Sequence, residues 1–362
     1  MPAFLEEISI RGYKSIRELQ SFKMLEGLNV LIGANGSGKT NFIRFFELLG
    51  NIIDPNKGLQ NYVRARGGAD ALLFRGMKVT PTLSASLKIA RNSYNFTLKA
   101  ADDRSLFFEK EAAPFDGPMY GVTSNNFGGG HLESKLVQRD SPSASELWIR
   151  TTLARWRVHH FHDTSPAAAV MGRCNIVDSA SLQDNAGNLA AFLLDIEKNH
   201  PAHFARIVET VRQVAPFFGR FELRDVGAGQ TQLLWKDRYS DLIYYPHQLS
   251  DGTLRYICLA TLLLQPNPPE MLVIDEPELG LHPFAIKLLA SLLQETAQTC
   301  QLIVSTQSSL LLDELAPEQV IVVNQQDGES TFQRQDPARL AAWLQEYTLG
   351  QLWEKNELGG LP

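Results

Sequence analysis

Eight residues near the start of the chain have the types and spacing of a phosphate-binding loop. In order they are Gly33, Ala34, Asn35, Gly36, Ser37, Gly38, Lys39 and Thr40. An apolar strand is predicted before them and an amphipathic helix after them, the context that the motif G-x-x-x-x-G-K-[ST] requires. The glycines let backbone N–H groups curl around phosphate oxygens, Lys39 reaches the β- and γ-phosphates, and Thr40 ligates Mg²⁺. The loop, with the adjoining Asn41, therefore predicts a nucleotide site rather than a flexible Gly/Ser turn.

A second chemical feature is an apolar run, residues 271–274, that ends in the carboxylates of Asp275 and Glu276. Continuous hydrophobicity is typical of a strand buried on both faces of a parallel sheet. Open α/β sheets bind ligands beyond the carboxyl ends of their strands, where these two acids lie. Alone, the segment would indicate a core strand with a solvated acidic turn. Beside a phosphate loop, it predicts an acidic edge of the same site.

Two further segments place polar residues at the ends of predicted elements. Ser250 and Gly252 open a largely apolar helix over residues 254–264, and Ser250 suits the N-cap position. The free N–H groups of such a helix start form an anion site, with an ordinary capped helix as the alternative. Residues 302–304 form another apolar strand, and Gln307 lies among the polar residues that follow it.

Three histidines, His159, His160 and His162, lie beside Asp163 and raise the question of a metal site. Alternation along a strand would send His160 to one face and His159 to the other. No second cluster of cysteine or histidine completes a ligand set. The favoured interpretation is therefore that these histidines do not bind a metal.

Composition restricts the class of protein. The chain has 362 residues, of which 44% are apolar and 20% charged, as expected for a globular protein. Its three cysteines are far apart in the sequence, so we expect each to be a reduced thiol that packs in the protein interior. Acids near the N-terminus and the lack of any apolar run of about 18 residues predict a cytoplasmic protein with no membrane span. A net charge of -6 disfavours strong DNA binding but leaves weak binding at a local groove open.

The periodicity of apolar residues predicts an α/β fold. The phosphate loop and the acidic strand are far apart in the sequence, so the fold must bring them together. Residues 83–109 predict an antiparallel meander of three strands. Residues 114–142 are rich in Gly, Ser and Asn and predict little order, or order only on binding a partner. The other predicted elements are helices over 145–157, 185–197, 201–214 and 336–347 and strands near 220–226, 230–235, 242–245, 320–323 and 330–333.

Together these motifs resemble the ABC-type ATPases of the RecF/SMC class, above all standalone RecF-like ATPases and the ATPase half of OLD-family proteins. The resemblance is most specific over residues 8–40 and 249–309. A C-terminal pattern with Gly350, Trp353 and Gly360 is similar to the tail of the standalone group, so a complete chain is expected. The resemblance implies a P-loop ABC-type ATPase head: an α/β fold with a mixed or parallel core sheet, an antiparallel β-subdomain and a compact helical lobe, without a long coiled coil. The expected parts are residues 1–110 (phosphate loop and β-subdomain), 111–216 (flexible loop and helical lobe) and 217–362 (second half of the head).

In this class two heads sandwich ATP, and the resemblance implies a role for each motif. The phosphate loop binds phosphate in cis, Asp275 holds Mg²⁺ beside Thr40, and Glu276 positions or deprotonates the attacking water. Ser250 and Gly252 contact the γ-phosphate bound to a second copy of the chain. The turn after Glu276 corresponds to the D-loop at the dimer interface.

Two positions depart from the commoner pattern of the class. Asp251 stands where most signature motifs have glycine, and Gln307 stands where a histidine generally follows the strand. A neutral amide can hydrogen-bond the γ-phosphate but cannot act as an acid or base, so slow hydrolysis is predicted. Arg11 and Lys14 are candidates for contacts with the nucleotide, and Gln60 is a candidate for the Q-loop.

The resemblance therefore implies an ATPase that needs ATP and Mg²⁺, forms a homodimer around ATP, and controls a separate protein effector in DNA-related work or antiphage defence. Lys39, Glu276 and Gln307 are its expected catalytic residues. A DNA-binding repair factor like RecF and a scaffold that binds ATP without hydrolysis are the alternatives. Too few residues follow Ser309 for the Toprim nuclease of OLD proteins.

Overall fold

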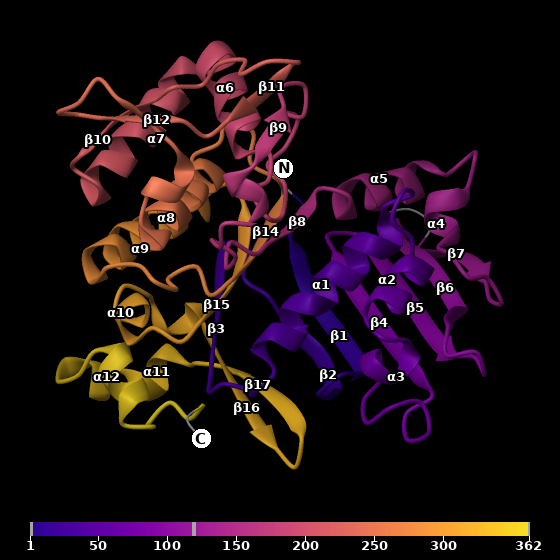
Figure 1. The fold of residues 1–362 in the computed structure, drawn as a ribbon. Helices are drawn as coiled ribbons and strands as arrows, with labels where there is room; N and C mark the ends of the chain where they lie inside the picture. The colour runs from indigo at the N-terminus through magenta and orange to yellow at the C-terminus, as the bar shows by residue number, and fades with distance from the viewer. Residues whose placement is uncertain (1–2, 118–120, 361–362) are drawn as a thin grey trace.

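Two six-stranded sheets organise the chain, and helix α1 (Lys39–Ile53) lies between them (Figure 1). The computed structural model describes residues 3–117 and 121–360. The antiparallel sheet has the order β2-β1-β4-β5-β6-β7 and contains β1 Leu5–Tyr13, β2 Ile16–Lys23, β4 Thr82–Ile89, β5 Asn92–Ala100, β6 Leu106–Gly117 and β7 Gly121–Gly128. The mixed sheet has the order β17-β16-β3-β15-β14-β8 and contains β3 Leu28–Ile32, β8 Trp156–His159, β14 Met271–Asp275, β15 Gln301–Thr306, β16 Val320–Gln326 and β17 Glu329–Arg334.

The central strands of the mixed sheet are buried on both faces. Every residue of β3, β14 and β15 is buried, as their continuous apolar runs predict, and these strands pair in parallel. Leu31 and Val273 pack with α1 on one face. Val30 packs on the other face with α8 (Asp251–Leu263) and α9 (Pro283–Thr296). The phosphate loop and the acidic strand tip therefore follow the carboxyl ends of strands in one sheet.

The antiparallel sheet covers the other side of α1. In β4 and β5 buried residues alternate with more exposed ones, so one face packs on α1 and on α5 (Ala144–Leu153) while the other faces away. The meander predicted over residues 83–109 is confirmed as β4 to β6. The sequence does not predict β2, because most of its side chains are exposed and show no apolar alternation.

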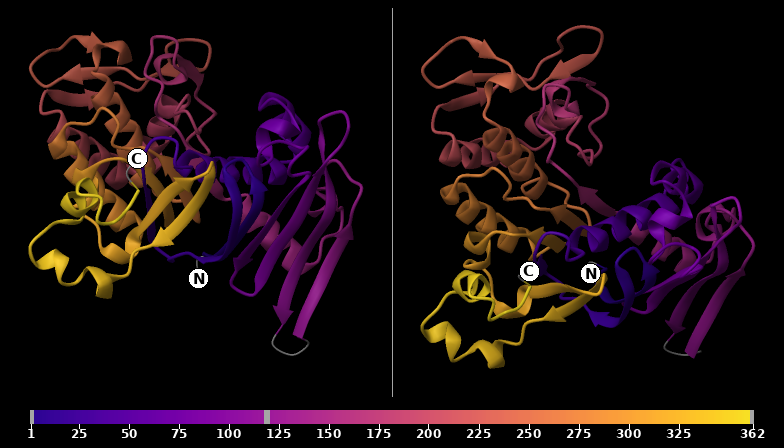
Figure 2. Two further views of the ribbon diagram at one scale, coloured as in Figure 1. Left: turned by 90° about the horizontal axis from the view of Figure 1, so that it is seen from below. Right: turned by 60° about the horizontal axis from the view of Figure 1, so that its bottom comes forward.

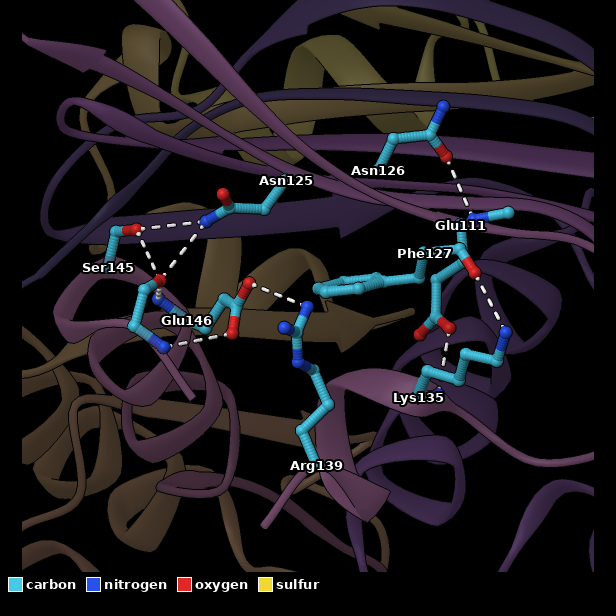
Figure 3. A network of polar contacts seen from close by, with 10 residues as sticks. Glu111, Asn125, Asn126, Phe127, Lys135, Arg139, Ser145 and Glu146 are labelled. Carbon is cyan, nitrogen blue, oxygen red and sulfur yellow. Dashed lines mark hydrogen bonds and ion pairs between the residues drawn. The ribbon is translucent and has the colours of Figure 1, made fainter. Parts of the chain in front are cut away.

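Polar contacts order the segment for which composition predicts little order (Figure 3). Its described residues contribute the end of β6, strand β7 and helix α4 (Lys135–Gln138). The backbone amide of Lys135 donates to the buried carboxylate of Glu111 (2.9 Å). Arg139 donates to Glu146 on α5 (3.3 Å), and that carboxylate completes the capping box that starts α5. For residues 114–117 and 121–142 the prediction of little order is wrong, because these polar groups bond to the sheet and to α5; residues 118–120 lie outside the described residues.

A second lobe covers the other face of the mixed sheet. Its elements are α6 Leu189–Asn199, α7 Pro201–Val214, α8 and α9, with the short strands β9 Arg173–Asn175, β10 Phe218–Phe221, β11 Gln230–Gln232, β12 Trp235–Asp237 and β13 Ile243–Tyr244. The helices predicted near 185–197 and 201–214 are confirmed as α6 and α7. The proposed division at residue 110 falls inside β6, and β8 from the expected second part joins the mixed sheet. The three-part division remains a proposal.

The C-terminal region is less helical than predicted. Residues 336–347 form α11 (Pro337–Leu340) and a separate 3₁₀ turn, and α12 (Leu349–Glu354) follows. The predicted helix is too long because Trp343 and Leu344 are exposed, so no apolar stripe holds a continuous helix on the protein.

Helix lengths exclude one architecture for the described part of the chain. Among the described residues α1 is the longest helix, with 15 residues, so this head has no long coiled coil. None of the described helices is both long enough and apolar enough to span a bilayer.

Candidate nucleotide site

The phosphate loop joins β3 to α1 in a conformation that requires glycine at two positions. Gly33 and Gly38 have φ angles of 156° and 112°. A Cβ at Gly33 would lie 2.2 Å from a backbone oxygen of β16, and one at Gly38 would lie 2.0 Å from Ser330 Oγ. Among the described residues, no heavy atom would lie within 4 Å of a Cβ at Gly36, and the buried Ser37 hydroxyl has no partner. The loop is packed tightly behind and is open in front, as a cradle for an anion requires.

Lys39 reaches back over this loop from the first turn of α1. The residue is only 4% exposed, and its ammonium group donates to Gly33 O (2.6 Å) and Ala34 O (3.0 Å). Burial lowers the pKa of Lys39, while the carboxylates of Glu276 and Asp275 oppose that shift. The structure thus brings the lysine of the phosphate loop close to the acidic strand tip.

Two residues outside the predicted motifs brace the phosphate loop from behind. The Ser330 hydroxyl, on β17, donates to Ser37 O (2.6 Å) and also lies within hydrogen-bond distance of Ser15 Oγ (2.7 Å). The Asn41 amide donates to the same Ser15 hydroxyl (2.7 Å), so its side chain contacts the turn between β1 and β2. Ser15 and Ser330 are 315 positions apart, and no local pattern in the sequence signals their contact.

Asp275 and Glu276 are fixed at the tip of β14 by the neighbouring strand. Asp275 is 6% exposed and accepts a hydrogen bond from Ser305 Oγ on β15. Glu276 has a φ of 42°, in the left-handed region that residues other than glycine seldom adopt. Its backbone amide donates to Ser305 O (3.1 Å), and its carboxylate accepts a hydrogen bond from Gln307 Nε2. The structure therefore places Gln307 directly on Glu276.

Glu278 is a buried acid that the sequence motifs did not identify. One carboxylate oxygen accepts hydrogen bonds from Thr306 Oγ1 (2.6 Å) and from the Gln307 backbone amide (2.9 Å). Burial raises the pKa of Glu278. Gln307 is thus held at two points, by Glu278 through its backbone and by Glu276 through its side chain.

Ser250 caps the start of α8 on the opposite face of the mixed sheet from α1. Its hydroxyl accepts a hydrogen bond from the Thr253 amide (3.2 Å). A Cβ at Gly252 would lie 2.4 Å from Gly280 O, so glycine allows α8 to approach the turn after the acidic tip. Within the described residues, the structure does not bring Ser250 or Gly252 to the phosphate loop of the same chain.

Arg255, one turn along α8, ties this helix to two loops. Its guanidinium donates to Phe161 O (3.2 Å), His162 O (2.8 Å) and Leu279 O (2.8 Å). His162 Nε2 in turn contacts Asp275 O (2.8 Å). Sequence reasoning missed His162 as a site residue. The signal was present, because polar residues gather beyond the carboxyl ends of parallel strands and β8 lies parallel to β14.

The three neighbouring histidines occupy different environments. Burial lowers the pKa of His159 to about 3. His160 Nε2 contacts Glu47 Oε1 on α1 (2.6 Å), whereas His162 contacts the backbone of the acidic tip. Each imidazole has its own surroundings, and the three do not converge as a ligand set.

Three candidate nucleotide contacts lie elsewhere. Gln60, on α2 (Leu59–Ala65), donates to a backbone oxygen of β6 (2.7 Å), so its side chain lies on the antiparallel sheet, and its assignment to the Q-loop stays a prediction. Lys14 donates to Ala71 O (3.2 Å), and burial lowers its pKa. Arg11 lines a hollow of about 630 Å³ on the outer face of the antiparallel sheet, with no lining residue from the phosphate loop. The structure does not bring Arg11 or Lys14 to the phosphate loop.

The fold and the site define an ABC-type ATPase of the RecF/SMC class. Residues 28–313 match the family model described as "AAA domain, putative AbiEii toxin, Type IV TA system", and the chain belongs to that family. The matched range includes the phosphate loop, the start of α8 and the acidic strand tip.

Solved structures and one curated relative agree with this class. The SMC head bound to the C-winged-helix domain of ScpA matches with a TM-score of 0.57 and 18% identity, over 94% of this chain and 99% of that one. The Smc head with an extended coiled coil, bound to the C-terminal domain of ScpA from Pyrococcus furiosus, matches with a TM-score of 0.59 and 15% identity, over 95% and 99%. Both likenesses show the fold. The chromosome partition protein Smc of Desulfitobacterium hafniense is 44% identical over 41 residues, which make up 11% of this chain and only 3% of that protein.

Proposed function

We propose that this chain binds ATP with Mg²⁺, hydrolyses it slowly, and closes with a second copy around the nucleotide to control a separate protein effector. The observation that carries the proposal is the separation of two helix starts suited to anions. The phosphate loop and Lys39 lie at the start of α1, on one face of the mixed sheet. Ser250 and Gly252 lie at the start of α8, on the other face. One chain thus supplies two half-sites, and two copies facing each other would complete both.

The oxygen ligands at the phosphate loop suit a magnesium nucleotide. Mg²⁺ prefers hard oxygen ligands, and the Thr40 hydroxyl and the Asp275 carboxylate would hold it. The unpartnered Ser37 hydroxyl and the open space at Gly36 fit a phosphate group. When bound, the ion neutralises charge that develops on the transferred phosphoryl group.

Glu276 is the group that would position and deprotonate the attacking water. The left-handed backbone at Glu276 and the hydrogen bond from Gln307 hold its carboxylate at the strand tip. The Gln307 amide can bond to a phosphate oxygen, but it cannot take a proton. Proton removal therefore falls to Glu276 alone, which supports slow turnover and a switch rather than a motor.

The family and its relatives support a protein effector and a setting in DNA-related work or antiphage defence. The family description names a putative toxin of a type IV toxin–antitoxin system. Two similar SMC heads are solved with a domain of ScpA bound. For this chain, the effector and the setting are inferences from that kinship.

Substitution of Glu276 by glutamine tests the proposal. Glu276→Gln keeps the size and hydrogen-bonding capacity of the side chain but removes its ability to take a proton. Size-exclusion chromatography should therefore show a dimer that persists with ATP and Mg²⁺ and a monomer with ADP. Glu109→Gln, which alters an exposed ion pair with Lys99, is the matched control and should behave as the wild type. A monomeric Glu276→Gln variant under saturating ATP and Mg²⁺ would contradict the proposal.

A further inference from the structure

Residues 348–360, which we name the C-terminal strap, run from the Gln307 side of the site to the phosphate loop. The strap contains α12 and the chain that follows it. Figures 1 and 2 show this yellow end of the chain beside the indigo strand β3. Its motif resembles the tail of the standalone ATPases, but nothing in the proposed function uses it.

The first anchor of the strap lies on α10 (Ser309–Leu312), the short helix that begins just after Gln307. Thr348 and Gln351 form a capping box that starts α12. The Gly350 amide then donates to Asp313 Oδ1 (2.8 Å) at the end of α10. A Cβ at Gly350 would lie 2.4 Å from Ser309 O, so only glycine lets the two helices approach this closely.

The second anchor lies on the phosphate loop. Gly360 O accepts a hydrogen bond from the Ala34 amide (2.5 Å). Gly360 has a φ of 90°, and a Cβ there would lie 3.3 Å from Gly33 Cα and 3.0 Å from Val322 Cγ1. The buried Trp353 indole lies against the same point, 3.5 Å from that Cβ position. The strap is therefore packed against the back of the phosphate loop.

The two anchors connect the groups that would contact opposite sides of the γ-phosphate. At one end Gln307 bonds to Glu276 and leads directly into α10. At the other end, the strap holds the Ala34 amide while Lys39 Nζ bonds to the Ala34 carbonyl (3.0 Å). A displacement of α10 or of the phosphate loop would displace the strap, because both anchors are packed so closely that only glycine fits.

We propose that the C-terminal strap is a positioning element that couples the Gln307 loop to the phosphate loop, so that the protein distinguishes ATP from ADP. The proposal rests on the proposed function, because it concerns the same nucleotide site. Coupling between two sites is reciprocal, so contact of Gln307 with a γ-phosphate stabilises the phosphate loop through the strap. Disturbing either anchor should weaken ATP binding more than ADP binding, since ADP lacks the γ-phosphate that Gln307 would contact.

Substitutions at the two anchors test the strap. Gly350→Ala should push α12 off α10, and Gly360→Ala should disturb the contact with the phosphate loop. Each should lower the affinity for ATP relative to ADP by about fivefold or more, the lower end of typical coupling between sites. Gly229→Ala is the matched control for Gly360→Ala, because Gly229 also has a positive φ, of 70°, and no described heavy atom lies within 4 Å of a Cβ there.

Isothermal titration calorimetry of the wild type and the variants, with ATP and with ADP, gives the ratio of the two affinities for each protein. If both anchor variants kept the wild-type ratio of ATP affinity to ADP affinity, the proposed role of the strap would be overturned. If the wild-type protein did not bind ATP, the proposed function would be overturned as well. Amide hydrogen exchange of the wild type gives a second readout if the variants fail to fold. Residues 348–360 should exchange more slowly with ATP than with ADP, and equal exchange would overturn the inference.

Discussion

The starts of α1 and α8 are both suited to anions, but they are built differently. Helix α1 begins at Gly38, in a left-handed conformation with no side-chain cap, so its first amides are open to a ligand. Helix α8 begins at Ser250, whose hydroxyl already accepts the Thr253 amide. Ser250 and Asp251 are exposed, whereas Lys39 is buried. One helix start is enclosed by its own chain, and the other is presented to solvent.

The difference between the two helix starts supports the proposal that one nucleotide site is divided between two copies of the chain. The α1 start is preorganised by Ser330 and Lys39 before any partner arrives. Leu279, whose backbone oxygen accepts a hydrogen bond from Arg255 on α8, is 43% exposed, and Phe284 in the first turn of α9 is 52% exposed. Exposed large apolar side chains favour contact with another protein. We infer that the first half-site binds the nucleotide and that the second recognises the nucleotide once it is bound.

The largest effect should follow from removing the buried cation of the enclosed half-site. Lys39→Ala should lower ATP affinity by about 100-fold, because it removes a charge-assisted contact with phosphate from a buried place. Isothermal titration calorimetry with ATP and Mg²⁺ measures this loss. Lys14→Ala is the control, because Lys14 bonds to Ala71 O and should leave the affinity unchanged. An affinity of the Lys39→Ala variant within a few-fold of the wild-type value would contradict this assignment of Lys39.

A smaller effect should follow from weakening the brace behind the same half-site. Ser330→Ala removes hydrogen bonds to Ser37 O and Ser15 Oγ and should lower ATP affinity by about fivefold, since a lost hydrogen bond costs roughly 1 kcal/mol. The same titration measures it. Ser86→Ala loses one hydrogen bond to Asn95 on the outer face of the antiparallel sheet and should have no effect on ATP. Equal affinities of the two variants would show that the phosphate loop is not preorganised by β17.

The parts of the site that depend on a few neighbouring residues could be predicted from the sequence. The spacing of the glycines predicts the conformation of the phosphate loop from Gly33 to Lys39. The apolar run that ends at Asp275 predicts a buried strand with a polar end. Both features follow from backbone geometry and periodicity, and the structure contains them. The contact of Gln307 with Glu276 could not be predicted, because it depends on which strands are neighbours in the sheet.

The supports of the site could not be predicted, because they join segments that are far apart in the chain. Ser15 and Ser330 meet across 315 positions, and His162 meets Asp275 across 113. A strand such as β2, exposed along most of its length, carries no period that reveals it. Gln60 is a candidate for the Q-loop by residue type alone, and no sequence pattern signals that its side chain bonds to the antiparallel sheet.

Mixing two defective variants tests most directly whether the site needs two copies. Lys39→Ala destroys the enclosed half-site. Ser250→Asp keeps a side chain that can cap α8 but places a negative charge where the γ-phosphate of the other copy would lie. Each variant alone should have almost no ATPase activity, whereas an equal mixture should recover about a quarter of the wild-type rate, because half of the dimers contain one intact composite site. A mixture no more active than its two components would contradict the account.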